Sequence, residues 1–129
     1  MNLLLDTAVF LWLIAGDERL SEPARSLVRD PDHRVWLSAV SLWEISVKQK
    51  AGRLTLPGPA WSYVTAARER HGVESLALSE LAVTHLSKLP DVHRDPFDRM
   101  LVCQAIEHEL VLVTNDPFVR RYPVKTSWS

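Results

Sequence analysis

The order of apolar and helix-forming segments is the feature that most constrains the fold of this chain. Short apolar runs are separated by longer helical segments, several of which begin with Ser, Asp or Pro. The predicted strands are residues 2–5, 35–37, 73–78 and 110–113, with Val124 expected in a last edge strand. Helices are expected at residues 7–15, 23–29, 38–50, 61–70, 79–89 and 96–109, with a helical turn at 117–121. Apolar strands that alternate with helices are typical of a parallel sheet covered on both faces, so the sequence predicts an α/β fold.

Length and charge narrow the class of protein further. At 129 residues the chain has the size of one ordinary domain, and residues 1–129 are expected to form a single unit. Its 15 Lys and Arg and 16 Asp and Glu give a formal net charge of -1, so a globally basic nucleic-acid-binding surface is excluded. Cys103 is the only cysteine, and no disulfide can form within the chain. The apolar start lacks a basic leader and is interrupted by Asp6, so we expect a cytoplasmic protein without membrane contact.

Two acidic residues, Asp6 and Asp116, follow predicted strands and precede helical segments. Both also suit a structural role, because Asp is favoured at helix N-caps and Pro117 fits a first helical position. In parallel α/β sheets, however, ligands bind beyond the carboxyl ends of the strands. We therefore expect both carboxylates to contribute to one site, and a capping role can coexist with that function.

Two further acids lie on predicted helices beside apolar residues. Glu44 is either a site residue or an exposed partner of Lys48 one turn later, a pairing worth about 0.2–0.5 kcal/mol. Asp98 lies in the first turn of a helix whose following residues are apolar, so its side chain is expected to face the body of the protein. Asp95 precedes Pro96 and fits an N-cap. We assign Asp95 mainly to structure, with an auxiliary role in the site left open, and Asp98 mainly to function.

Four carboxylates at one edge of a sheet would repel one another strongly. Two unit charges ~4 Å apart cost about 4 kcal/mol at an effective dielectric constant of ~20. Divalent cations relieve this repulsion, and oxygen ligands suit Mg²⁺ or Mn²⁺, whereas the sequence has no Cys and His ligands with zinc spacing. Because carboxylate-bound Mg²⁺ keeps several waters and bridges to phosphate oxygens, the acidic set points to phosphodiester chemistry.

The acidic residues lie in an ordered set of motifs that resembles a known family. The motifs are residues 4–7 (LLDT), 38–45 (SAVSLWEI), 93–101 (HRDPFDRML) and 113–116 (VTND). Together they resemble PIN-domain proteins, and more narrowly the VapC toxins of bacterial type II toxin–antitoxin systems. The resemblance covers essentially the whole chain.

The resemblance carries expectations about structure and activity. It implies a three-layer α/β/α fold with a short, mostly parallel sheet, and RNA cleavage that depends on Mg²⁺ or Mn²⁺. The family's acidic positions fall on Asp6, Glu44, Asp98 and Asp116, and its common hydroxyl falls on Thr114, where it would orient a metal-bound water. It also implies a homodimer, an RNA substrate such as a tRNA, and a cognate antitoxin that blocks the acidic site, often with an Arg.

Basic and aromatic residues give weaker indications. Lys48, Arg94 and Arg99 flank the acids and are expected either to grip RNA phosphates or to form a solvated basic face. Trp43 is expected in the core or in a dimer interface. The histidines are scattered without ligand spacing and are interpreted as structural or surface residues, with His93 the nearest to the acidic motifs.

Two alternative functions remain open on the sequence alone. Intact acidic positions do not guarantee turnover, so the chain could be a PIN-like module that binds RNA or a partner without cleavage. A housekeeping RNA-processing nuclease would carry the same motifs. Metal-dependent cleavage that is lost on changing Asp6 separates a nuclease from a binding module.

Overall fold

A five-stranded sheet forms the centre of the computed structural model, which describes residues 1–128. The strands lie in the order β3-β2-β1-β4-β5, and every neighbouring pair is parallel. Their bounds are β1 (Asn2–Leu5), β2 (Arg34–Ser38), β3 (Glu74–Leu76), β4 (Val111–Val113) and β5 (Thr126–Ser127). The central strand β1 therefore has a neighbour from the first half of the chain on one side and from the second half on the other.

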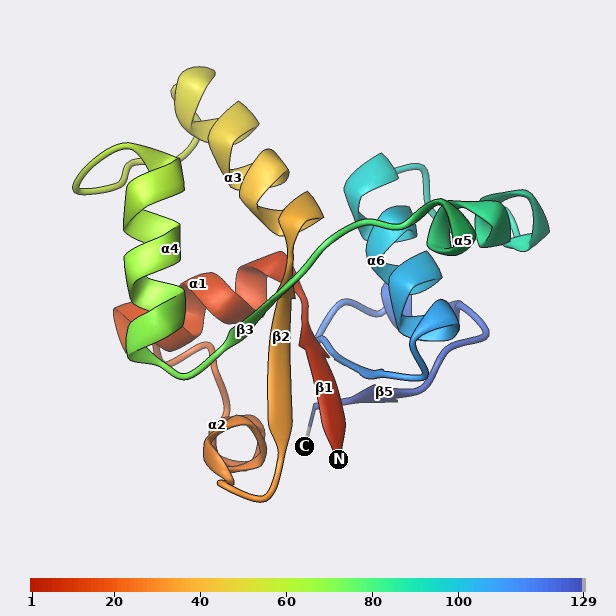
Figure 1. The fold of residues 1–129 in the computed structure, drawn as a ribbon, viewed down its shortest axis with the longest axis horizontal. Helices are drawn as coiled ribbons and strands as arrows, with labels where there is room; N and C mark the ends of the chain where they lie inside the picture. Colours follow the sequence, from red (N-terminus) through yellow and green to blue (C-terminus); the bar gives the residue numbers. More distant parts are fainter. Residues whose placement is uncertain (129) are drawn as a thin grey trace.

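Helices cover both faces of this sheet (Figure 1). Helices α1, α2 and α4 pack on one side of β1 and β2, and α5 and α6 on the other. Their bounds are α1 (Thr7–Ala15), α2 (Glu22–Arg29), α3 (Ala39–Lys50), α4 (Ala60–Arg70), α5 (Glu80–Val83) and α6 (Pro96–Glu107), with 3-10 helices η1 (Thr84–Lys88) and η2 (Val119–Arg121). The arrangement is the expected three-layer α/β/α fold with a parallel sheet.

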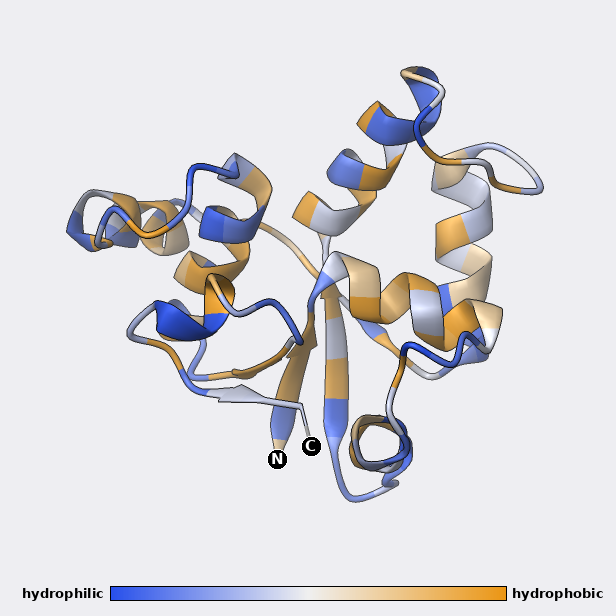
Figure 2. Ribbon diagram, turned by 180° about the vertical axis from the view of Figure 1, so that it is seen from behind, coloured by the Kyte–Doolittle hydropathy of each residue, from blue (hydrophilic) through white to orange (hydrophobic). Residues whose placement is uncertain are grey.

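Two hydrophobic cores lie on the two faces of the sheet, and β1 contributes to both. Leu3 and Leu5 belong to the core beneath α1, α2 and α4, whereas Leu4 belongs to the core beneath α6. All three side chains are fully buried. Successive residues of a strand point to opposite faces, so a strand covered on both sides must be apolar throughout. Figure 2 shows this hydrophobic character along β1 after its hydrophilic first residue.

Side-chain hydrogen bonds fix where helices α3 and α6 start. Ser38 caps α3 by accepting a hydrogen bond from the backbone N–H of Val40. Asp95 caps α6 through the N–H groups of Phe97 and Asp98, with Pro96 at the first helical position. Caps of this kind contribute about 1 kcal/mol each. The caps hold the amino-terminal turns of α3 and α6 in a defined orientation.

Three predicted elements differ from the structure. Val124 lies outside the last strand, because its N–H bonds to the carbonyl of Tyr122 in a tight turn, and β5 pairs with β4 only from Thr126 onward. The helix expected over residues 79–89 is divided into α5 and η1, and the strand expected over 73–78 is shortened to β3. None of the helices described within residues 1–128 has the length and apolar character that a membrane crossing requires.

Candidate active site

Asp6 lies at the carboxyl end of β1, where the chain passes from the sheet into α1. Its backbone N–H donates to the carbonyl of Val113 at the end of β4 (3.0 Å). The side chain of Thr114, the residue after β4, donates from Oγ1 to Asp6 Oδ2 (2.7 Å). The ends of β1 and β4 are thus joined by two hydrogen bonds. This is also the point where the strand order changes direction, which is the usual ligand site of open parallel sheets.

Asp116 is placed by the same threonine. Its backbone N–H donates to Thr114 Oγ1 (3.1 Å), and its Oδ1 accepts a hydrogen bond from the N–H of Phe118 (2.8 Å). Thr114 is fully buried, so both of its side-chain hydrogen bonds are shielded from water. One hydroxyl therefore sets the relative positions of two acidic residues.

Glu44 reaches the site from the middle of α3. Its side chain is buried, and its Oε2 pairs with Lys48 Nζ at 2.5 Å. The other oxygen, Oε1, is buried without a hydrogen-bond partner among residues 1–128. Leaving a buried acceptor of this kind unpaired costs about 1–3 kcal/mol or more. Glu44 pairs with Lys48 as one of the two expectations held, but it is buried rather than exposed, and its Oε1 lies unpaired inside the described part of the protein.

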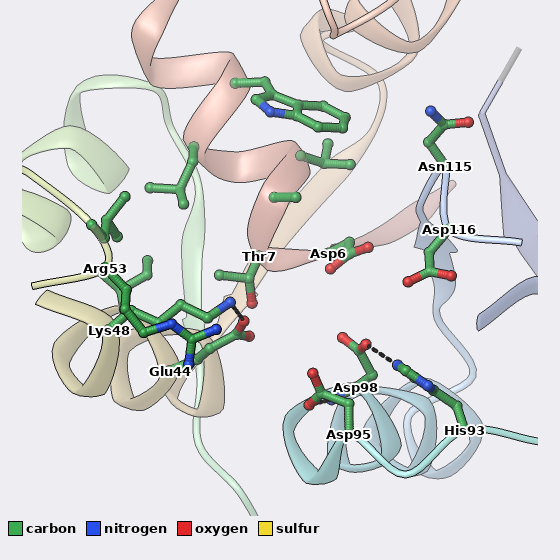
Figure 3. Close-up of a pocket in the computed structure, with 16 residues that line it drawn as sticks. Asp6, Thr7, Glu44, Lys48, Arg53, His93, Asp95, Asp98, Asn115 and Asp116 are labelled. Atoms are coloured by element: carbon green, nitrogen blue, oxygen red, sulfur yellow. Dashed lines mark hydrogen bonds and ion pairs between the residues drawn. The ribbon is translucent and has the colours of Figure 1, made fainter. Parts of the chain in front are cut away.

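Asp98 extends from the first turn of α6. Its Oδ2 lies 3.1 Å from Nε2 of His93, and its backbone N–H is bound by the carboxylate of Asp95. Asp95 is occupied as the cap of α6, as its position before Pro96 indicates. Figure 3 shows the carboxylates of Asp6, Asp98 and Asp116 directed toward a shared space, with Asp95 beside them.

The pKa values of Asp98 and Asp6 reflect the convergence of the carboxylates on one space. Burial and repulsion from Asp6, Asp95, Glu44 and Asp116 raise the pKa of Asp98 to about 8. Burial also raises the pKa of Asp6; the hydrogen bond from Thr114 opposes this shift, and the charges of Glu44 and Asp116 add to it. Desolvation and like charges both favour the protonated acid. Without a cation, Asp6 and Asp98 therefore hold their protons more tightly than isolated carboxylic acids do.

The acids line one cavity of about 580 Å³ together with two basic side chains, Lys48 and Arg53. Figure 3 shows Lys48 and Arg53 on one side of the cavity and His93 on the other. The lining includes Asp6, Glu44, Asp95, Asp98 and Asp116. The cavity therefore combines a negative centre with a positive margin.

The donor set of this cavity fits a divalent cation. Glu44 Oε1 is an acceptor without a partner in the described part of the chain, and repulsion among the carboxylates is relieved by a positive charge. In addition, His93, Asp98 and Asp116 each offer one ligand atom, and these atoms lie within 4.8 Å of one another. A set made almost entirely of oxygen donors suits Mg²⁺ or Mn²⁺ better than softer metals.

Comparison with known proteins identifies the family to which this fold belongs. Residues 3–125 match the PIN domain. This chain belongs to the PIN-domain family. A relative from Mycobacterium tuberculosis named Ribonuclease VapC22 is 30% identical over 123 residues, which cover 94% of this chain and 92% of the relative. Ribonuclease VapC16 from the same organism is 34% identical over 61 residues, or 47% of this chain and 43% of the relative.

Solved structures share the fold of this PIN domain over its whole length. VapBC2 from Rickettsia felis bound to a promoter DNA fragment aligns with a TM-score of 0.75 at 17% identity, covering 100% of both chains. DNA-bound VapBC from Salmonella typhimurium aligns with a TM-score of 0.70 at 20% identity, covering 98% of this chain and 97% of the other. The resemblance drawn from the sequence motifs and the predicted fold class are both confirmed.

The basic residues singled out in the sequence of this PIN domain occupy different surroundings. Lys48 lines the acidic cavity, whereas Arg94 is exposed and lines a separate hollow beside it. Arg99 does not line the cavity; its Nη1 donates to backbone carbonyls of Pro90 and His93 and to the hydroxyl of Tyr122. Arg99 thus holds the loop before α6 in place.

His93 lines the cavity of the PIN domain, although the sequence alone indicated a structural or surface role for it. It comes from the loop at residues 89–95, for which the periodicity of apolar residues gives no orientation. The one sequence signal for His93 is its position five residues before Asp98, just upstream of the Asp95–Pro96 helix start. A loop that precedes a capped first turn can fold back over that turn, and here it brings His93 against Asp98.

Proposed function

We propose that this chain is an endoribonuclease of the VapC type, the toxin of a toxin–antitoxin pair, which hydrolyses RNA phosphodiester bonds with the help of Mg²⁺ or Mn²⁺. The observation that carries the proposal is the convergence of Asp6, Glu44, Asp98 and Asp116 on one cavity at the carboxyl edge of a PIN-domain sheet. The name of the relative VapC22, a ribonuclease, supports RNA as the substrate class.

The four acids would hold the divalent cation. When bound, such a cation lowers the pKa of a coordinated water and stabilises negative charge on phosphoryl oxygens. The chain's own contribution is to orient the ligands. Thr114 is enclosed and bonded to Asp6 Oδ2, so we assign its hydroxyl to holding Asp6 rather than to orienting a water. Lys48 fixes one oxygen of Glu44 and leaves Oε1 directed into the site.

Basic side chains at the margin would hold the RNA backbone. Lys48 and Arg53 line the cavity beside the acids, and phosphate oxygens are the natural partners of both. Contacts of this kind position the nucleic acid without reading its bases. We therefore expect the affinity for RNA to fall with added salt, because binding releases cations from the phosphates.

The same proposal predicts two protein partners, an antitoxin and a second copy of this chain. The solved VapBC assemblies share this fold, and an antitoxin segment that carries an Arg would complement the negative centre of the cavity. We also propose a homodimer; the exposed Trp43 and Val47 on α3 and Trp61 on α4 offer apolar surface for a protein interface. Action on cellular RNA, with tRNA as one candidate, would take place in the cytoplasm.

Cleavage assays with a variant of one acid test the proposal. Purified protein is incubated with single-stranded RNA, structured RNA and total tRNA in Mg²⁺, Mn²⁺ or EDTA. Asp6→Asn is compared with Asp32→Asn, a matched change at an exposed position in the turn before β2, at the opposite edge of the sheet. We expect cleavage in either metal, loss in EDTA and in Asp6→Asn, and full activity in Asp32→Asn.

Two results would contradict this function. Cleavage that persists in EDTA, or in Asp6→Asn, would show that the acidic cavity is not the site of the reaction. Binding of RNA or of an antitoxin by the wild-type protein, without cleavage of any of the three substrates, would favour a binding module. Growth arrest on expression without an antitoxin separates a toxin from a housekeeping nuclease.

A further inference from the structure

The loop before α6 is fixed to the body of the protein at His93. The hydroxyl of Tyr122 accepts a hydrogen bond from the N–H of His93 (3.0 Å) and lies 3.0 Å from the carbonyl oxygen of the same residue. Arg99 Nη1 also donates to that carbonyl (3.3 Å) and to the Tyr122 hydroxyl (3.2 Å). Tyr122 is buried, so these bonds anchor the backbone of one loop residue from two directions.

The imidazole ring of His93 is held as well as its backbone. It stacks on Phe118, with ring centroids 5.4 Å apart and planes inclined by 14°. Its Nε2 lies 3.1 Å from Asp98 Oδ2, and both side chains are largely shielded from solvent. A carboxylate that binds a metal is ionised and only accepts hydrogen bonds, so toward an ionised Asp98 the Nε2 atom carries the shared proton. In that state the ring is a fixed donor directed at one oxygen of one carboxylate.

We propose that His93 is a positioning residue of the metal centre, an inference that rests on the metal-dependent function proposed above. Its Nε2–H holds Oδ2 of Asp98 and so leaves Oδ1 oriented as the ligand atom. Hydrogen bonds that orient a ligating side chain contribute to the metal affinity of a site, and their loss typically costs 10–100-fold. The contacts of Phe118, Tyr122 and Arg99 with His93 serve this orientation.

Direct ligation by His93 is a distinct arrangement with a different consequence. A nitrogen ligand favours Mn²⁺ over Mg²⁺, so loss of a ligating imidazole weakens Mn²⁺ binding more than Mg²⁺ binding. Loss of a positioning donor weakens the binding of both metals to the same extent, because the same Asp98 oxygen serves both. The observed contact of Nε2 with Asp98 favours positioning.

The experiment measures the affinities for Mg²⁺ and Mn²⁺ by calorimetric titration of the full chain. His93→Leu removes the donor at similar volume, and His93→Gln keeps an N–H group near the place of Nε2. The control is His85→Leu. His85 Nε2 pairs with Glu107 Oε1 at the carboxyl end of α6 (2.9 Å), outside the cavity. Phe118→Leu removes the ring on which His93 stacks and changes an exposed residue.

We expect His93→Leu to weaken both metals by about 10–100-fold, in equal proportion. His93→Gln should recover most of that affinity, Phe118→Leu should show a smaller loss for both metals, and His85→Leu should bind like the wild type. Wild-type affinity in His93→Leu, or a loss confined to Mn²⁺, would overturn the positioning role while leaving the nuclease proposal intact. A wild-type protein that binds neither metal would overturn both.

Discussion

Asp98 keeps its proton in the metal-free folded protein at pH values where an unfolded chain has lost it. Burial and four neighbouring carboxylates raise its pKa from 3.8 to about 8. Between these values the folded state binds more protons than the unfolded state, so the free energy of unfolding falls as the pH rises. Asp17 does not contribute to the pH dependence between 3.8 and about 8. Its hydrogen bonds with Arg19 lower its pKa to about 2, so its effect on stability lies below pH 3.8.

We therefore predict that the metal-free protein loses stability between pH 3.8 and about 8. Asp98→Asn removes the titrating group, so this variant should melt at a higher temperature than the wild type near pH 8 and should show a flatter pH dependence. Calorimetry in EDTA measures both quantities, with Asp32→Asn as the control. A wild-type melting temperature that rises over this pH range would contradict the prediction.

Thr114 is the residue whose loss should affect both stability and metal binding. Thr114→Val keeps the shape but removes the hydroxyl that donates to Asp6 and accepts from the N–H of Asp116. We predict a loss of about 1–3 kcal/mol in the free energy of unfolding, measured by urea denaturation, because buried polar groups lose their partners. Thr114→Ser should keep most of the stability and the metal affinity. Equal stability of the Val and Ser variants would exclude the proposed role.

At the scale of elements, the start of α6 carries two acids with different roles, Asp95 as the N-cap and Asp98 in the first turn. Asp95 satisfies two backbone N–H groups of the helix, whereas Asp98 faces its neighbours in the cavity. We predict that Asp95→Ala lowers the free energy of unfolding by about 0.5–2 kcal/mol through loss of the cap, and that Asp95→Asn, which can still cap, does not. Urea denaturation of both variants in EDTA measures this difference, and equal destabilisation of the two would count against the cap.

The sequence predicted an element well where a local pattern of residues determines it. It predicted an element poorly where contacts between residues distant in the sequence determine it. Continuous apolar runs identify the strands of the parallel sheet. Residues such as Ser38 and Asp95–Pro96 identify the starts of the helices that carry acids. The position of β5 could not be predicted, because it depends on pairing with β4 rather than on local periodicity. The environments of His93 and Arg99 could not be predicted either, since each depends on Tyr122, which is distant in the sequence.

At the scale of the whole molecule, the proposed metal binding at the cavity would be linked to folding. A cation that binds only the folded chain stabilises it by mass action, by about 2.7 kcal/mol at a concentration 100 times its dissociation constant. We predict that added Mg²⁺ or Mn²⁺ raises the melting temperature of the wild type and of Asp32→Asn. Asp6→Asn and Asp98→Asn should show little or no rise. Differential scanning calorimetry at several metal concentrations checks this, and an equal rise in all four proteins would place the stabilising cation elsewhere.

The hydrogen bond between Thr114 and Asp6 joins residues that are 108 positions apart. The acids of the cavity therefore come from the beginning, the middle and the end of the chain. A growing polypeptide that has not yet emerged from the ribosome as far as Asp116 has only part of the cavity. The cavity is therefore complete only after β4 and Asp116 have been synthesised and β4 has paired with β1, so the acidic site cannot assemble on a shorter nascent chain.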